Sequence, residues 1–293
     1  MKLQDYHLWT ALITPLKPGL GVDYKSLEKI ISEQTEAKNG LLILGSTGEA
    51  LNLDLDTRKK IVEFVLSLKP SSPVMVGVGG HDLGAQREWI KWLETKNIDA
   101  YLMVTPIYAK AGDEGQYLWF KDLMDKVSKP VMLYNVPGRA GSWLSFKAVR
   151  RLNSHPNFWA IKEAGGSPEK MKEYLKAANG GQVFCGDDGL MSEFAAAGSC
   201  GLVSVASNTW PMATHTYVKK CLNGSVTDLP QWKHACDTLF IASNPVPAKA
   251  LMAMEGRIAH NTMMPPLASE DLKDFGRLKE ANHFVNTWYK NNK

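Results

Sequence analysis

The sequence has few cysteines, and their positions exclude the small disulfide-stabilised and zinc-binding classes. Only four occur in 293 residues, and none lies in a CxxC pair or at a zinc-ligand spacing from a histidine. We therefore expect them to be reduced, small, buried side chains in a cytoplasmic protein. The four are Cys185, Cys200, Cys221 and Cys236.

Long apolar runs and a strong charge imbalance are also missing. No stretch reaches the roughly 20 residues of a membrane-spanning helix. The segment Met1–Ile13 lacks the basic start and long apolar stretch of a signal peptide. The 34 basic and 30 acidic side chains give a net charge of +4, and the basic residues are spread along the chain. We predict a cytoplasmic protein that binds neither a membrane nor a nucleic acid.

What the sequence does contain is eight short apolar runs, often β-branched. They are mostly continuous rather than alternating, which is typical of strands covered on both faces. Amphipathic segments with helical spacing fill the intervals, for example Asp23–Lys38, Asp54–Leu68 and Ser167–Asn179. The runs are Leu8–Ile13, Leu41–Leu44, Val74–Val78, Ala100–Val104, Val131–Tyr134, Phe158–Ile161, Gln182–Cys185 and Gly201–Val205.

Eight strand–helix units in this length predict an α/β fold, a (β/α)8 TIM barrel spanning residues 1–224. The rival is a doubly wound open sheet, which would carry GxGxxG after its first strand. The chain has Thr14-Pro15-Leu16-Lys17 there instead. Residues 225–293 contain no strand-like run and predict a C-terminal helical extension packed on the barrel. Its predicted helices are Asp228–Ile241, Pro247–Glu255 and Glu270–Tyr289.

Lys162 ends the apolar run Phe158–Ile161 and is unusual there, because lysine is almost never fully buried without a partner. Burial disfavours the ammonium form of a lysine, and a neutral amine is a nucleophile towards carbonyls. Lys162 is therefore a candidate for Schiff-base formation. The alternative is a strand-end lysine whose ammonium group reaches solvent.

Other reactive groups also follow predicted strands, where a barrel of this kind has its active site. The turn Gly45-Ser46-Thr47-Gly48 offers backbone N–H groups at a helix start, which can bind a carboxylate. Tyr134 can relay protons, and Arg139 can hold a second carboxylate with two hydrogen bonds. Each also has an ordinary explanation as a chain turn or a solvated side chain. Together they suggest a keto acid held as an iminium, a chemistry that needs no metal or other cofactor.

With these motifs in order, the chain resembles the dihydrodipicolinate synthase family, within the N-acetylneuraminate lyase superfamily of class I pyruvate aldolases. The resemblance covers essentially the whole chain. It rests on Gly45-Ser46-Thr47-Gly48-Glu49, Thr105-Pro106-Ile107-Tyr108, Tyr134-Asn135-Val136-Pro137-Gly138-Arg139, Ile161-Lys162-Glu163-Ala164, Gly186-Asp187-Asp188 and Asn244-Pro245-Val246-Pro247.

The resemblance implies condensation of pyruvate with L-aspartate 4-semialdehyde, the first committed step towards diaminopimelate and lysine. Lys162 would form the Schiff base, and Tyr134 would be the central proton donor and acceptor. Thr47 and Tyr108 would complete its relay, with Tyr108 reaching in from a neighbouring subunit of a homo-oligomer, commonly a tetramer built as a dimer of dimers. The substrate-binding residues would be Ser46, Gly48, Arg139, Gly186 and Val203.

Two positions depart from the family pattern. Ser46 replaces the threonine usual in the synthases, and Gly-Ser-Thr-Gly-Glu is also the form seen in sialic acid lyases. Ile107 stands where many synthases have a second aromatic residue. The alternative function is thus another pyruvate aldolase, one that cleaves a sugar acid such as N-acetylneuraminate. Arg139 argues against it, because such lyases generally lack an arginine there. A non-catalytic barrel that only binds a ligand is a third hypothesis, and Lys162, Tyr134 and Arg139 argue against it.

The resemblance also bears on regulation, since many synthases of the family are inhibited by lysine bound at a subunit interface. The positions that would bind lysine differ here, and the carboxylate expected to pair with its ammonium group is missing. Arg58 would instead place a positive charge near that group. The sequence therefore predicts weak or no inhibition by lysine. The altered positions are Ala50, Leu51, Leu55, Arg58, His81, Ala85 and Ile107.

Overall fold

The computed structural model describes residues 2–293 and contains eight parallel strands that close into one barrel in chain order. The predicted (β/α)8 barrel is confirmed, because helices connect the successive strands. The strands are β1 (Leu8–Ala11), β2 (Gly40–Ile43), β3 (Val74–Val78), β4 (Ala100–Val104), β5 (Val131–Asn135), β6 (Phe158–Glu163), β7 (Gln182–Cys185) and β8 (Leu202–Ser204).

The helices follow the predicted pattern of amphipathic segments. The α-helices are α1 (Tyr24–Glu36), α2 (Leu55–Ser67), α3 (Leu83–Leu93), α4 (Asp113–Met124), α5 (Pro137–Ala140), α6 (Phe146–Leu152), α7 (Pro168–Ala178), α8 (Met191–Ala197), α9 (Ala206–Thr209), α10 (Pro211–Leu222), α11 (Leu229–Thr238), α12 (Val246–Met254) and α13 (Phe275–Asn292). Short 3₁₀ turns lie at Leu3–Asp5, Ala50–Asn52, Asp188–Leu190 and Ser269–Asp271.

Polar side chains cap the starts of several helices. The Ser167 side chain accepts a hydrogen bond from the Lys170 N–H, which confirms the predicted start of α7. Asp54 accepts from the Thr57 N–H in the same way and begins α2. Such a cap contributes about 1 kcal/mol to helix stability. The last predicted helix was placed too early, because Asp274 caps α13 and residues 269–271 form a separate 3₁₀ turn.

Two strands end at other residues than the predicted apolar runs, because the hydrogen bonds between neighbouring strands stop earlier or continue further. The β2 strand ends at Ile43, because Leu44 has a φ of 55°, in the left-handed region. The β6 strand instead continues past its apolar run, because Lys162 pairs with Tyr134 and Glu163 pairs with Asn135 on β5. Lys162 is thus part of the strand rather than a residue beyond its end.

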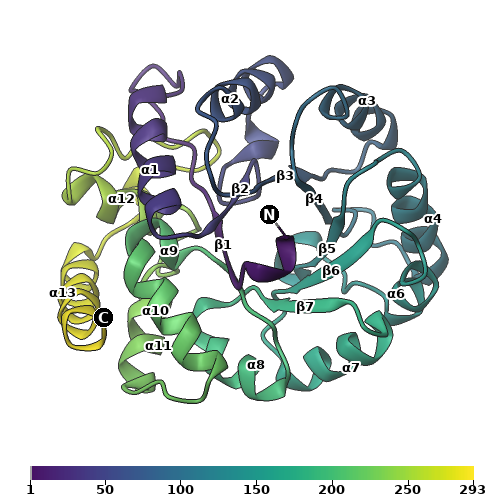
Figure 1. Cartoon of the computed structure of the whole chain (residues 1–293). Helices are drawn as coiled ribbons and strands as arrows, with labels where there is room; N and C mark the ends of the chain where they lie inside the picture. The colour runs from purple at the N-terminus through teal and green to yellow at the C-terminus, as the bar shows by residue number, and fades with distance from the viewer. Residues whose placement is uncertain (1) are drawn as a thin grey trace. The chain divides into compact units, whose positions relative to one another are not determined.

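The chain forms two compact units, one made of residues up to Pro73 with Ser204–Lys293, the other of Val74–Val203. In the first, α12 and α13 pack against helices α9 to α11, as Figure 1 shows in yellow and green. Trp232 of α11 stacks on Tyr217, with ring centroids 4.2 Å apart, and meets Trp288 of α13 edge-on. The boundary between residues 224 and 225 stays a prediction. Within residues 2–293, no helix combines the length and the apolar character needed to cross a membrane.

Candidate active site

In the unit Val74–Val203, the structure brings Lys162 and Tyr134 together. They are paired in register on β6 and β5, and the Lys162 Nζ lies 4.3 Å from the centroid of the Tyr134 ring. Lys162 is only 4% exposed, so its amine does not reach out into solvent as the alternative interpretation required. The Tyr134 carbonyl accepts hydrogen bonds from both the N–H and the hydroxyl of Thr105, at 3.0 and 2.9 Å. These bonds fix the backbone of β5 at Tyr134 to Thr105, the residue that follows β4.

Gly186 follows β7 and leaves room for the Lys162 side chain. A Cβ atom at residue 186 would lie 2.9 Å from the Lys162 Cε and 2.6 Å from the Ala164 Cβ, closer than real Cβ contacts. Any larger residue would have to displace the reactive chain. Val203, in β8, is fully buried.

Tyr108 and Arg139 lie after β4 and β5, as the sequence predicted, but both point outward within the single chain. Tyr108 is 91% exposed and has a φ of 69°, a left-handed conformation that is unusual for a bulky residue. Arg139 lies on the one-turn helix α5 and is exposed. In this unit the structure thus groups Lys162, Tyr134 and Gly186, and leaves Tyr108 and Arg139 at the surface.

Sequence reasoning assigned no role to Glu163, which is fully buried beside Lys162. Its carboxylate accepts hydrogen bonds from Asn135 Nδ2 at 2.5 Å and from the Gly165 N–H at 3.0 Å. Asn135 in turn accepts from the Leu144 N–H at 2.7 Å. The network joins β6 to the segment that follows Arg139. Burial is the main cause that raises the pKa of Glu163 to about 7, partly offset by these two hydrogen bonds.

The other unit contains the turn Gly45-Ser46-Thr47-Gly48 after β2. It was predicted to begin a helix, but it is a turn leading only to a short 3₁₀ segment, and α2 starts later, at Leu55. The Gly48 N–H donates to the Gly45 carbonyl at 3.1 Å, and the Glu49 N–H donates to the Ser46 carbonyl at 3.1 Å. Binding of a substrate carboxylate by Ser46 and Gly48 stays a prediction, and the Thr47 hydroxyl is the side-chain group best fixed in the turn.

Three further residues surround this turn, and sequence reasoning gave none of them a role. Asn244 Nδ2 donates to Thr47 Oγ1 at 2.9 Å. Lys249 of α12 forms an ion pair with Glu49, and both side chains are 0% exposed. Burial lowers the pKa of Lys249, and the nearby Glu49 carboxylate counteracts that shift. The available signal was a single lysine within the apolar run of α12, since a buried lysine requires a partner.

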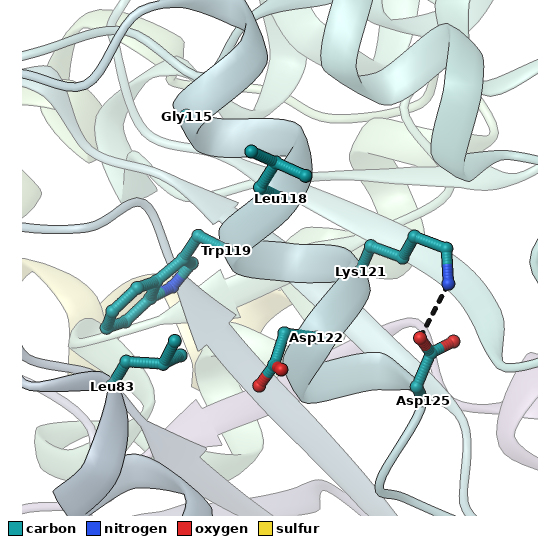
Figure 2. A pocket seen from close by; sticks show the side chains of 7 residues that line it. All are labelled: Leu83, Gly115, Leu118, Trp119, Lys121, Asp122 and Asp125. Carbon is teal, nitrogen blue, oxygen red and sulfur yellow. Dashed lines mark hydrogen bonds and ion pairs between the residues drawn. The ribbon is translucent and has the colours of Figure 1, made fainter.

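A pocket between α3 and α4, shown in Figure 2, contains none of these groups. Its lining is largely apolar, from Leu83, Leu118 and Trp119. Lys121, its basic residue, is paired with Asp125 at 2.6 Å. Its charged side chains are engaged in ion pairs, Asp122 with Arg87 and Lys121 with Asp125, so the strand ends remain the candidate site.

Comparison with known proteins places the whole chain in one enzyme family. The model of the dihydrodipicolinate synthetase family matches residues 6–281. The 4-hydroxy-tetrahydrodipicolinate synthase of Wolbachia pipientis wMel is 47% identical over 287 residues, 98% of each chain. The structure of the enzyme from Cyanidioschyzon merolae with lysine bound matches with a TM-score of 0.90 and 26% identity, over 97% of this chain and 99% of that one. The chloride-inhibited enzyme of Acinetobacter baumannii, solved with pyruvate, matches with a TM-score of 0.86 and 29% identity, over 97% and 99%.

The raised pKa of Glu163 predicts a specific pH dependence of stability. Because the carboxyl holds its proton more tightly when folded, it contributes stability that is fully present below about pH 4.5 and is lost as pH rises through about 7. Glu163→Gln should remove this dependence. The stability of the variant relative to the parent should therefore rise by on the order of 3 kcal/mol between pH 4 and pH 8. Urea unfolding at both pH values measures it.

The control is Glu173→Gln, which changes a glutamate on α7 that is paired with Lys176 near the surface. Its pKa is lowered rather than raised, mainly by the hydrogen bond from Lys176, so any change with pH should have the opposite sign. A stability difference between Glu163→Gln and the parent that stays constant over this range would contradict the shift.

Proposed function

The chain belongs to the dihydrodipicolinate synthetase family, and we propose that it condenses pyruvate with L-aspartate 4-semialdehyde to give 4-hydroxy-tetrahydrodipicolinate. This is the first committed step towards diaminopimelate and lysine. The observation that carries the proposal is the buried Lys162 amine beside the Tyr134 ring, with the absent side chain of Gly186 leaving it space.

The chemistry follows from the amine. The Lys162 Nζ attacks the pyruvate ketone, and loss of water gives a protonated iminium. That cation is an electron sink, so a methyl proton leaves and an enamine forms. The enamine carbon attacks the aldehyde of the second substrate. The amine of that substrate then closes the ring on the iminium carbon and displaces Lys162. None of these reaction steps requires a metal or another cofactor.

Each of these steps moves protons, and we assign the transfers to Tyr134, relayed by Thr47 and Tyr108. Thr47 and the turn around Ser46 and Gly48 bind the pyruvate carboxylate, and Gly186 and the Val203 carbonyl line the same substrate. The 91% exposure of Tyr108 supports a role in a second copy of the chain, since a tyrosine gains most from a partner surface. We propose a homo-oligomer, a tetramer built as a dimer of dimers.

Lys162 provides the direct test of the mechanism. Borohydride added in the presence of pyruvate should reduce the imine and leave the mass of the adduct on the protein. Lys162→Ala should abolish both the adduct and activity in a coupled assay with both substrates, because the amine is the nucleophile. Mass spectrometry of the intact protein and of its peptides detects the label.

An exposed lysine on α7 gives the control, and Lys172→Ala should be labelled as the parent is. Labelling that persists in Lys162→Ala would refute the assignment. A parent protein that is labelled but turns over only a sugar acid such as N-acetylneuraminate would favour the sugar-acid aldolase over the synthase.

Arg139 is proposed to bind the carboxylate of the semialdehyde. Arg139→Ala should raise the KM for the semialdehyde and lower kcat/KM by about 10²-fold or more, since loss of a charge-assisted hydrogen-bonded pair costs roughly 3 kcal/mol. Labelling with pyruvate and borohydride should largely survive. Steady-state kinetics with each substrate varied in turn measures the effect. Arg150→Ala, an exposed arginine of α6, serves as the control, and an equal loss of pyruvate binding in Arg139→Ala would count against this role.

Inhibition by lysine should be weak or absent. No carboxylate stands at the expected position, and Arg58 would lie near the ammonium group of the ligand. Titration of lysine into the coupled assay should give half-inhibition only above about a millimolar, which corresponds to a binding free energy weaker than roughly −4 kcal/mol. The Cyanidioschyzon merolae enzyme, solved with lysine bound, serves as the positive control in the same titration. Half-inhibition below about a millimolar would mean that other residues form the site.

A further inference from the structure

The ion pair between Glu49 and Lys249 is buried so completely that its function needs an explanation. Both side chains are 0% exposed. Each group has a second hydrogen bond: Lys249 Nζ donates to the Thr262 carbonyl at 2.9 Å, and Glu49 Oε2 accepts from the Met264 N–H at 2.7 Å. A buried pair of this kind is weak evidence for stability, because apolar residues of similar volume often serve as well. What it adds is a fixed position for the groups it joins.

The group that it fixes is the turn after β2. Glu49 has a φ of 56°, so the backbone reverses in a left-handed conformation two residues after Thr47. The carbonyl of Gly48 accepts a hydrogen bond from Thr14 Oγ1 at 2.7 Å. The backbone just beyond Thr47 is therefore held by Thr14, which follows β1, on one side and by Lys249 on the other.

A separate hydrogen bond fixes the direction of the Thr47 hydroxyl. Asn244 Nδ2 donates to Thr47 Oγ1, and the two side chains are 5% and 2% exposed. A hydroxyl has one proton to donate and accepts at its oxygen lone pairs. The Asn244 Nδ2 can donate a hydrogen bond but cannot accept one. The hydroxyl proton of Thr47 must therefore point to a different group. Thr47 is thereby set as a donor.

Both contacts come from one short stretch of chain. Asn244 lies two residues before α12, Lys249 lies in its first half, and the Lys249 N–H donates to the Pro245 carbonyl at 3.0 Å. We propose that the start of α12 is a positioning element for catalysis: Asn244 directs the Thr47 hydroxyl for proton transfer, and the Lys249–Glu49 pair fixes the turn that carries it. The inference rests on the proposed function, in which Thr47 belongs to the proton relay.

Two substitutions of Asn244 test whether it orients the Thr47 hydroxyl or only fills space beside it. Asn244→Ala removes the donor, and kcat should fall about ten-fold because the hydroxyl can rotate. Asn244→Asp keeps the shape but presents a carboxylate, which accepts the hydroxyl proton and withdraws it from the relay. It should lower kcat at least as much as Asn244→Ala. Near-parental kcat in Asn244→Asp would indicate a space-filling role and overturn the proposal.

A double-mutant cycle tests whether Asn244 acts through Thr47. In a Thr47→Val background the hydroxyl is gone, so adding Asn244→Ala should lower kcat less than two-fold further. Independent, additive losses would mean that Asn244 acts by another route. Activity of Thr47→Val above background is required, and borohydride labelling with pyruvate supplies a second rate if turnover is too slow to measure.

The ion pair is tested by replacing both charges at once, Glu49→Gln with Lys249→Met, so that neither is left buried alone. A fold check by thermal melting accompanies the kinetics, and kcat should fall several-fold. The matched control is Arg257→Gln. Arg257 Nε donates to Glu33 at 3.0 Å and Nη1 to the Thr209 carbonyl at 2.6 Å, so it ties the same C-terminal segment to other elements. It should lower Tm and leave kcat within two-fold.

The outcomes separate this inference from the proposed function. A parent protein without condensing activity would refute the proposed function and, with it, the premise of this inference. If the parent is active and the kcat of Asn244→Ala is no lower than that of Arg257→Gln, only the positioning role is refuted. If the double variant of the ion pair does not fold, the cycle between Asn244 and Thr47 still decides the question.

Discussion

Most of the site depends on one constraint, the presence of a lysine inside a parallel sheet that is buried on both faces. Lys162 can lie there because its neighbours accommodate it: its Nζ lies 4.3 Å from the centroid of the Tyr134 ring, and residue 186 has no side chain. A larger residue at 186 would occupy the volume of the lysine chain. The strand register that pairs Lys162 with Tyr134 therefore determines where the chemistry can occur.

Polar groups next to the reactive ones are fixed by networks within each compact unit. In one, Glu163 and Asn135 join β6 to the segment after Arg139. In the other, Asn244 and Lys249 hold the turn that contains Thr47. In our proposal, the side chains of these networks contact no substrate. They support neighbouring residues that do. In both units, segments that carry proposed functional residues are thus held by hydrogen bonds from buried residues.

The sequence predicted those features that depend on short stretches of chain. Continuous apolar runs identified the strands because burial on both faces leaves that pattern, and helical spacing identified Ser167–Asn179 as a helix. Lys162 stood out because its type conflicts with its surroundings. The prediction of a helix start at Gly45-Ser46-Thr47-Gly48 was wrong. The left-handed conformation of Glu49 and the hydrogen bonds within the turn determine the backbone conformation there. Partners such as Lys249 could not be assigned, since pairing across distant segments leaves no local pattern.

Glu49 and Lys249 are 200 residues apart in sequence, and this separation has a consequence for biosynthesis. The ribosome produces the chain from its N-terminus, so the segment with Glu49 emerges long before α12 exists. Until α12 arrives, Glu49 must keep its charge hydrated, because an unpaired buried carboxylate is strongly unfavourable. The turn can adopt its final form only when nearly the whole chain is available. A nascent chain of this protein is therefore expected to acquire its strands progressively and its reactive geometry last.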